Sequence, residues 1–273
     1  MPCRTSAWHD RRVPRPRTVT PQLPTEIGVH EGLSYSLWLP TAPPPGGVIT
    51  LHGAGSCKEN HHDFARAAIG AGLAAIAFDQ RGHGDSEGAM DGRALDDVVA
   101  VGALLRSRLG GESARAAAAA WPAPAIALRG SSMGGYLALV SAAAVGAVAV
   151  VAICPASDEG LRRGLSGGRF TFDADRPALD RFLADHDVAA AARELEAPVL
   201  LLHAEGDEQV PVEHSRELAA LLQSPRSRLI TLPGGHHRSI QHDAEMQAVS
   251  LRFITRELER ANPGREHADP RPS

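Results

Sequence analysis

A serine, an aspartate and two adjacent histidines could act together as a nucleophilic centre. Ser132 stands in the middle of the turn Gly130-Ser131-Ser132-Met133-Gly134, and Asp207 and the pair His236-His237 follow later in the chain. A serine hydroxyl becomes a nucleophile when an imidazole removes its proton, and a carboxylate then fixes the tautomer of that imidazole. These residue types therefore predict attack on an electrophilic carbonyl carbon.

The turn around Ser132 connects an apolar strand to a helix. Glycines two residues before and two residues after Ser132 leave space for the flanking backbone, so the hydroxyl is expected to project out of the fold. The Met133 amide would then lie at a helix N-terminus, where it can donate to a developing oxyanion. Ser131 is the alternative nucleophile, but only Ser132 has a glycine at both flanking positions.

The elements that must position these residues alternate between short apolar runs and helix-like segments. Such alternation is typical of an α/β fold with a mostly parallel central sheet flanked by helices. The predicted strands are Val48–Leu51, Leu73–Phe78, Ala125–Leu128, Ala147–Ile153, Val199–His203 and Arg228–Leu232. The predicted helices are Phe64–Ile69, Ala94–Leu109, Met133–Ala144, Val212–Leu222 and Ala244–Glu259. Side chains that follow parallel strands should meet at the carboxyl edge of the sheet.

Three further segments complete the expected organisation. Leu33–Leu39 alternates apolar and polar residues, which predicts a half-exposed antiparallel edge strand. Residues 155–197, with predicted helices at Ala178–Ala184 and Val188–Leu195, are longer than an ordinary connection and predict a short helical lid; the alternative is a long crossover. One domain is expected over residues 25–261, between tails at 1–24 and 262–273 whose composition predicts disorder.

Four motifs, in this order, resemble those of the α/β-hydrolase superfamily. They are LHGAG at 51–55, FDQRGHGDSEG at 78–88, LRGSSMGG at 128–135, and LLHAEGDEQVP at 201–211 followed by LPGGHH at 232–237. The resemblance implies that Ser132 is the nucleophile and Asp207 the acid of a catalytic triad. It also implies that the amides of Ala54 and Met133 form an oxyanion hole.

Two assignments have neighbours that compete with them. The Pro-Gly-x-x-His spacing usual in that superfamily selects His237 as the base, with His236 as the alternative. The GDEQVP context selects Asp207 as the acid, with Asp158 as the alternative because it also follows a predicted strand.

The resemblance to small esterases and serine aminopeptidase-like hydrolases implies an enzyme that cleaves a carboxylic ester or related acyl bond through an acyl-enzyme. It implies a small-molecule acyl substrate and no cofactor. The alternatives are aminopeptidase-like, thioesterase or acyltransferase activity, or a non-catalytic protein that binds a ligand in the same fold. An aminopeptidase would need carboxylates for the substrate amine, which Asp158, Glu159, Asp173 and Asp175 could supply.

Composition excludes several other classes of protein. A net charge of −4 indicates neither nucleic acid nor an anionic membrane as a partner, and we expect a cytoplasmic protein. No apolar stretch reaches the roughly 20 residues of a membrane span. The oligomeric state is not predicted.

Other polar clusters are expected to be structural. His61-His62-Asp63 lacks a metal-binding pattern, so no metal site is predicted and a solvated helix start is expected. The polar loop at 79–86 should be held by hydrogen bonds to its own backbone. Cys57 and Cys154 are interpreted as small packing residues.

Overall fold

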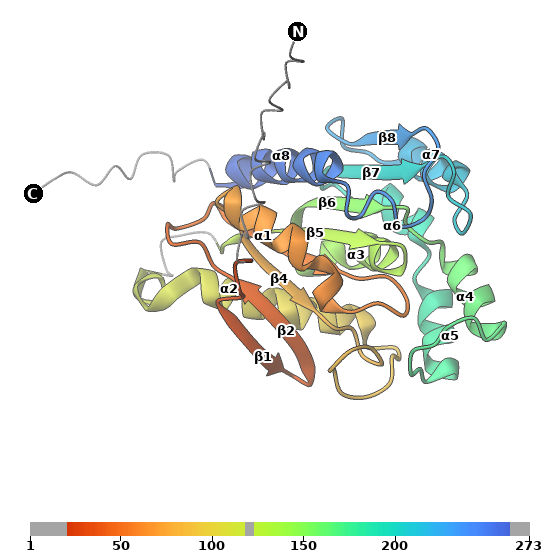
Figure 1. Cartoon of the computed structure of the whole chain (residues 1–273), viewed down its shortest axis with the longest axis horizontal. Helices are drawn as coiled ribbons and strands as arrows, with labels where there is room; N and C mark the ends of the chain where they lie inside the picture. The colour runs from red at the N-terminus through yellow and green to blue at the C-terminus, as the bar shows by residue number, and fades with distance from the viewer. Residues whose placement is uncertain (1–20, 118–122, 263–273) are drawn as a thin grey trace, which may run out of the picture.

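An eight-stranded sheet forms the centre of the molecule in the computed structural model, which describes residues 21–117 and 123–262. The strands lie in the order β1-β2-β4-β3-β5-β6-β7-β8, and those from β4 to β8 in this order are parallel (Figure 1). Their bounds are Glu26–His30 (β1), Leu33–Trp38 (β2), Gly46–Leu51 (β3), Ala74–Phe78 (β4), Ala125–Ser131 (β5), Ala147–Ile153 (β6), Val199–Ala204 (β7) and Arg228–Leu232 (β8). The predicted α/β fold with a mostly parallel sheet is confirmed.

The antiparallel edge differs from the prediction in one respect. β2 was expected to be a half-exposed edge strand, but it is buried along its whole length because β1 pairs with it on the outside. The two strands form a hairpin through Glu31 and Gly32, whose φ angles of 51° and 79° are those of a type I′ turn. β1 therefore takes the edge, and its Ile27 and Val29 side chains face solvent.

Helices cover both faces of the sheet. On one face, α1 (His62–Gly70) and α8 (Ala244–Ala261) bury Phe64, Ile254 and Leu258 against the strands. On the other face, α2 (Ala94–Ala117) and α3 (Met133–Val145) do the same with Val98, Leu105 and Leu137, and α7 (Val212–Leu221) adds Leu218. A sheet buried on both faces explains why its strands are continuous apolar runs.

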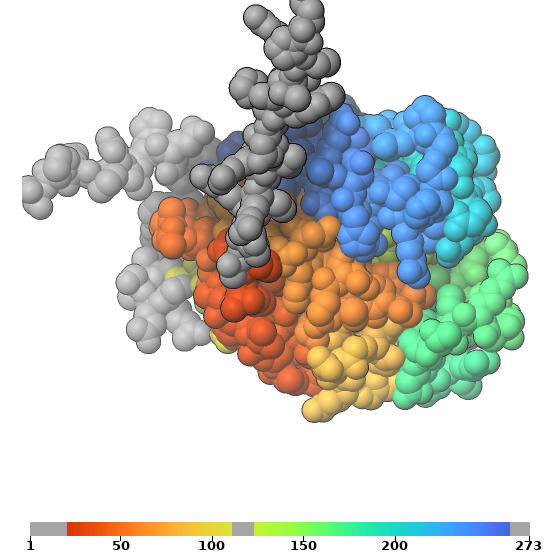
Figure 2. All heavy atoms as spheres, in the orientation of Figure 1, coloured from red at the N-terminus to blue at the C-terminus, as the bar shows by residue number. Residues whose placement is uncertain are grey.

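Three helices occupy the long interval between β6 and β7. They are α4 (Asp158–Ser166), α5 (Arg176–Asp185) and α6 (Val188–Glu194), each begun by a side chain that caps its N-terminus. α4 was not predicted. Figure 1 shows α4 and α5 together at one end of the molecule, and Figure 2 shows this end of the surface next to the loop that follows β4. A β-bridge between Met90 and Ala174 joins the two segments.

The expected tails lie largely outside the described residues, whose secondary structure runs from Glu26 to Ala261. In this part of the chain no helix has the length and apolar character that crossing a bilayer requires.

Candidate active site

Ser132 sits in a strained turn between β5 and α3. Its φ of 55° and ψ of −118° are unusual for a residue with a side chain, and close packing holds it there. A Cβ atom on Gly130 would lie 1.9 Å from the Gly134 carbonyl oxygen, and one on Gly134 would lie 2.1 Å from that of Leu51. Both flanking glycines are therefore sterically required, as the sequence pattern predicted.

The neighbouring serine lies in a different environment. Ser131 is the last residue of β5 and only 4% of it is exposed, whereas Ser132 is half-buried. The strand-to-helix turn thus separates the two adjacent hydroxyls, and Ser132 is the more accessible.

His237 forms a close pair with Asp207. The distance from His237 Nδ1 to Asp207 Oδ2 is 2.7 Å, and because a carboxylate only accepts, Nδ1 carries the proton and Nε2 is left as the basic nitrogen. His236 is exposed and its Nδ1 accepts from the Arg238 amide instead. Asp158 accepts from the Val188 amide at 3.3 Å. The structure therefore brings together Asp207 and His237, and neither alternative contacts this pair.

Asp207 has a full set of hydrogen-bond donors. Its Oδ1 accepts from the amides of Gln209 and Val210 at 2.8 and 2.9 Å. His203, fully buried on β7, lies 3.5 Å from Oδ2 through Nε2, which also donates to the Val210 carbonyl. Burial alone would raise the pKa of Asp207, but the bonds from His203, His237 and the two amides outweigh it and lower that pKa. Asp207 is therefore held as a carboxylate.

His203 is a positioning residue that the sequence analysis missed. Ser215 Oγ lies 2.7 Å from His203 Nδ1, so the serine hydroxyl fixes the ring in the tautomer that donates toward Asp207. The only signal in the sequence was a histidine four residues before the acid, inside an otherwise apolar strand.

Cys154 lies between the serine turn and the Asp207–His237 pair. The Ser132 amide donates to the Ile153 carbonyl at 2.9 Å, and Cys154 follows directly, with its sulfur within 4.8 Å of the paired atoms of Asp207 and His237. No hydrogen bond joins Ser132 Oγ to His237 among the described residues. Such bonds commonly tighten only when substrate is present.

Cys154 packs in the core, as expected, and it also borders the Asp207–His237 pair. It has a φ of 42°, it is fully buried, and burial raises the pKa of its thiol to about 12. It stays protonated beside the Asp207 carboxylate. With Asp207 and His237 it forms a group whose spacing could hold a metal ion, but the Asp207 and His237 atoms already share a proton between them.

The loop after β3 packs against the Ser132 turn. A Cβ atom on Gly53 would lie 3.3 Å from Ser132 Cβ, so the loop and the turn are in direct contact. The Gln80 amide donates to His52 Nε2 at 3.0 Å, which leaves His52 Nδ1 to donate to the Gly53 carbonyl at 2.9 Å. Because a trans peptide holds its N–H opposite its C=O, this bond fixes the direction of the Ala54 amide. Met133 begins α3, whose first amides lack intrahelical acceptors.

A buried ion pair holds the polar loop after β4. Asp79, which is fully buried, accepts from the Lys58 ammonium and the Lys58 amide, both at 2.7 Å, and from the Asp85 amide at 2.9 Å. Lys58 is the only lysine of the chain. Gly84 approaches so closely that a Cβ atom there would lie 2.1 Å from Asp79 Oδ2. The loop is thus fixed by side-chain bonds to its own backbone, in the way its composition suggested.

The neighbouring histidines are not solvated, contrary to expectation. His61 is only 1% exposed, and burial lowers its pKa well below the ordinary range. The His62 ring packs edge-on against Trp38, with centroids 4.7 Å apart. The three polar residues gave no sign that this helix start contacts the loop that carries His237, where His242 bonds to Asp63 at 2.9 Å and the Gln241 side-chain amide donates to the Asn60 carbonyl at 3.3 Å.

Comparisons with known proteins agree with this geometry. Residues 42–163 match the family model of the serine aminopeptidases, S33, and residues 114–260, more than half of the chain, match that of the prolyl oligopeptidase family. No curated protein matches the sequence.

Solved structures with the same fold include three hydrolases of low sequence identity. The chain is 19% identical to the Paleococcus ferrophilus monoacylglycerol lipase, with a TM-score of 0.62 over 82% of this chain and 99% of the lipase. It is 20% identical to mouse α/β-hydrolase domain-containing protein 10, with a TM-score of 0.63 over 87% and 99% of the two chains. It is 21% identical to the Pyrococcus furiosus esterase Pf2001, with a TM-score of 0.64 over 85% and 91%. Since sheet order, serine turn and both family models agree, the chain belongs to the α/β-hydrolase superfamily.

Proposed function

We propose that this protein is a serine hydrolase that cleaves carboxylic esters through an acyl-enzyme intermediate. The observation that carries the proposal is the 2.7 Å bond between His237 Nδ1 and Asp207, at the same sheet edge as the strained Ser132 turn. That bond orients the free Nε2 of His237 as a general base. The likeness in fold to a monoacylglycerol lipase and to an esterase supports the proposal.

The first half of the reaction forms the acyl-enzyme. Ser132 Oγ attacks the carbonyl carbon of the ester while its proton passes to His237 Nε2. The amides of Ala54 and Met133 donate to the resulting oxyanion, which carries the charge that develops in the transition state. The ester C–O bond then breaks, and His237 returns the proton to the leaving oxygen, which departs as an alcohol.

The second half restores the enzyme. His237 takes a proton from a water molecule, whose oxygen attacks the acyl carbon, and the bond to Ser132 Oγ breaks with return of the proton to that oxygen. The product is the free carboxylic acid. Asp207 remains ionised throughout, because its donors hold its pKa below the ordinary range.

The test compares two adjacent serines. Hydrolysis of p-nitrophenyl acetate and labelling by a fluorophosphonate are measured for the wild type, Ser132→Ala and Ser131→Ala. We expect Ser132→Ala to lose labelling and to lower kcat by about 10³-fold or more, whereas Ser131→Ala keeps most of both.

Three outcomes would overturn the proposal. Full activity in Ser132→Ala would exclude Ser132 as the nucleophile. Absence of both turnover and labelling in the wild-type protein would indicate a ligand-binding protein instead. A higher kcat/KM for alanyl p-nitroanilide than for the ester would indicate an aminopeptidase.

A further inference from the structure

Four aromatic rings run in contact from the segment between α4 and α5 to the loop after β3. The rings of Phe170 and Phe172 stack with centroids 5.1 Å apart, and the His83 ring stacks on Phe172 at 4.2 Å. His83 in turn lies against His52, with centroids 4.8 Å apart and the ring planes tilted by 59°. Residues far apart in the sequence thus form one continuous row of rings.

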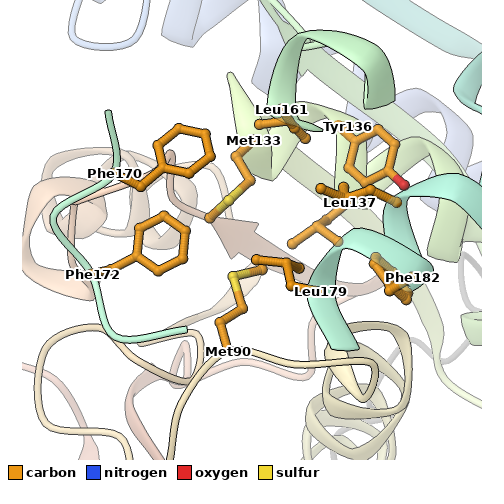
Figure 3. Close-up of a pocket in the computed structure, with 10 residues that line it drawn as sticks. Met90, Met133, Tyr136, Leu137, Leu161, Phe170, Phe172, Leu179 and Phe182 are labelled. Carbon is orange, nitrogen blue, oxygen red and sulfur yellow. The ribbon is translucent and has the colours of Figure 1, made fainter. Parts of the chain in front are cut away.

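Phe170 and Phe172 form the outer end of this row, on the segment of residues 167–175. Both rings line a small apolar pocket against α3, and Figure 3 shows them side by side, directed toward the Met133 side chain. Met133 follows Ser132 and begins α3. This end of the row of rings therefore lies near the serine turn.

The segment at 167–175 is anchored to two loops. The Asp173 amide donates to the Gly82 carbonyl at 3.1 Å, and the Met90 amide donates to the Asp173 carbonyl at 2.9 Å. Thr171 approaches the loop after β3, because a Cβ atom on Gly55 would lie 3.2 Å from the Thr171 hydroxyl oxygen. The segment therefore contacts both the loop after β3 and the loop after β4.

His83 contributes its ring to the row rather than a proton. Only 5% of the residue is exposed, and its Nδ1 donates to the Arg81 carbonyl at 3.0 Å. Its Nε2 is buried and has no hydrogen-bond partner among the residues that the structure describes. Burial lowers the pKa of His83, so the ring is neutral near pH 7. Since an unbonded buried nitrogen is unfavourable, the rings on either side must hold this imidazole in place.

His52 connects the row of rings to the backbone of the loop after β3. The Gln80 amide donates to its Nε2, and its Nδ1 donates to the Gly53 carbonyl, the bond that fixes the direction of the Ala54 amide. Both bonds require one orientation of the His52 ring. Without the His83 ring there would be a space beside His52, and neighbouring groups relax into such spaces. The Ala54 amide would then lose its fixed direction.

We propose that His83 and Phe172 are positioning residues, which hold the Ala54 amide in place for the oxyanion through the His52 ring. This inference rests on the proposed function and adds two residues to it. A displacement of about 1 Å in a catalytic group can cost about 100-fold in rate. We expect His83→Ala to lower kcat for p-nitrophenyl acetate by about 10- to 100-fold and to change KM by less than about threefold, because the oxyanion develops only in the transition state.

The test adds a mimic of the oxyanion to these kinetics. A trifluoromethyl ketone forms a bond from its carbonyl carbon to Ser132 Oγ, the hydroxyl proton passes to His237 Nε2, and the ketone oxygen becomes an oxyanion. Its inhibition constant should rise in His83→Ala by about the factor by which kcat falls. His83→Phe keeps a ring in the row and should retain kcat within about threefold of the wild type. A loss in His83→Phe equal to that in His83→Ala would overturn the role of the ring.

Two further variants guard against a general loss of folding. Phe172→Ala removes a half-buried ring and should lower kcat by about fivefold or more, again with little change in KM. His186→Ala is the matched control, because His186 stacks on Phe182 at 4.3 Å with the same 28° between ring planes as the pair of His83 and Phe172, but on α5. It should leave kcat unchanged. A loss in His186→Ala as large as that in Phe172→Ala would overturn the inference.

Hydrogen exchange separates this inference from the proposed function. The amides of residues 52–57 are followed by mass spectrometry, since the Ser56 amide donates to the Gly53 carbonyl at 3.2 Å and reports on the loop. Faster exchange in His83→Ala, in a protein whose wild type turns over no ester, would overturn the hydrolase proposal and leave the coupling of His83 to the loop standing. Ester turnover with unchanged kcat, inhibition constant and exchange in His83→Ala would overturn the positioning role alone.

Discussion

Replacing Arg129 with methionine should separate stability from activity. Arg129 lies on β5, three residues before Ser132, and it is fully buried. Its Nη2 donates to the Gln241 carbonyl at 2.9 Å, and its guanidinium carbon lies 4.0 Å from the Phe64 ring centroid. Its Nε and Nη1 have no hydrogen-bond partner among the described residues.

The opposing contributions to stability nearly cancel. Methionine forfeits a charge-assisted bond of about 1.5–3 kcal/mol and a cation–π contact of about 0.5–2 kcal/mol. In return it removes a buried charge: burial lowers the pKa of Arg129 to about 10, which corresponds to a penalty of about 3 kcal/mol on the charged form. The Gln241 carbonyl still accepts from Gln247 Nε2 at 3.2 Å. We therefore expect the free energy of unfolding to change by less than about 2 kcal/mol, in either direction.

Ester turnover should fall, because Gln241 lies in the loop between β8 and α8 that also carries His237. Without the Arg129 bond this loop is less constrained, and a displacement of about 1 Å in a catalytic group can cost about 100-fold in rate. We expect Arg129→Met to lower kcat for p-nitrophenyl acetate by about 10- to 100-fold, and to speed tryptic cleavage after the exposed Arg238.

Urea denaturation, ester kinetics and limited proteolysis check this prediction together. Arg106→Met is the control, because Arg106 also donates to a backbone carbonyl, that of Val145 at 2.6 Å, but at the end of α3 far from Ser132. A loss of more than about 3 kcal/mol in the free energy of unfolding, with kcat unchanged, would refute the reasoning.

Two further predictions concern buried titratable groups. Lys58→Met leaves the fully buried Asp79 without its ammonium partner and should lower the free energy of unfolding by about 3–5 kcal/mol in urea denaturation. Arg162→Met, which breaks a solvent-exposed pair with Asp180, is the control and should leave the urea midpoint essentially unchanged. Equal losses in the two variants would contradict the importance of burial. Burial, and to a lesser extent the nearby His83, lowers the pKa of His52 from 6.5 to about 4. Between these pH values the unfolded chain binds a proton at His52 that the folded protein does not bind. The free energy of unfolding therefore falls as the pH falls from 6.5 to 4. The difference between the two pKa values of His52 corresponds to about 3 kcal/mol in the free energy of unfolding. The free energy of unfolding of His52→Gln should decline less over this range than that of the wild type, and parallel curves would show that His52 is protonated without cost in the native state.

The elements that the sequence analysis misplaced share a physical cause. β1 was missed because Ile27 and Val29 face solvent, so its alternation carries no sign of a buried face. α4 was missed because two glycines and several charges obscure the Leu161–Leu165 pair that it buries. In both cases the element is defined by what packs against it, and that partner is distant in the sequence.

Local steric constraints and hydrophobic periodicity were sufficient to predict the central sheet and the turn at Ser132. Parallel strands that are buried on both faces must be apolar on both sides. The turn has no room for a side chain at Gly130 and Gly134, so it requires glycine there and can be recognised from the sequence.

Only the tertiary structure decided which side chains meet. Adjacent His236 and His237 differ in that one is exposed and the other is bonded to Asp207. The proximity of Cys154 to that pair, the buried Arg129 and the apolar pocket each join segments far apart in the chain. Contacts of this kind depend on how whole elements pack, which the local patterns of residues do not specify.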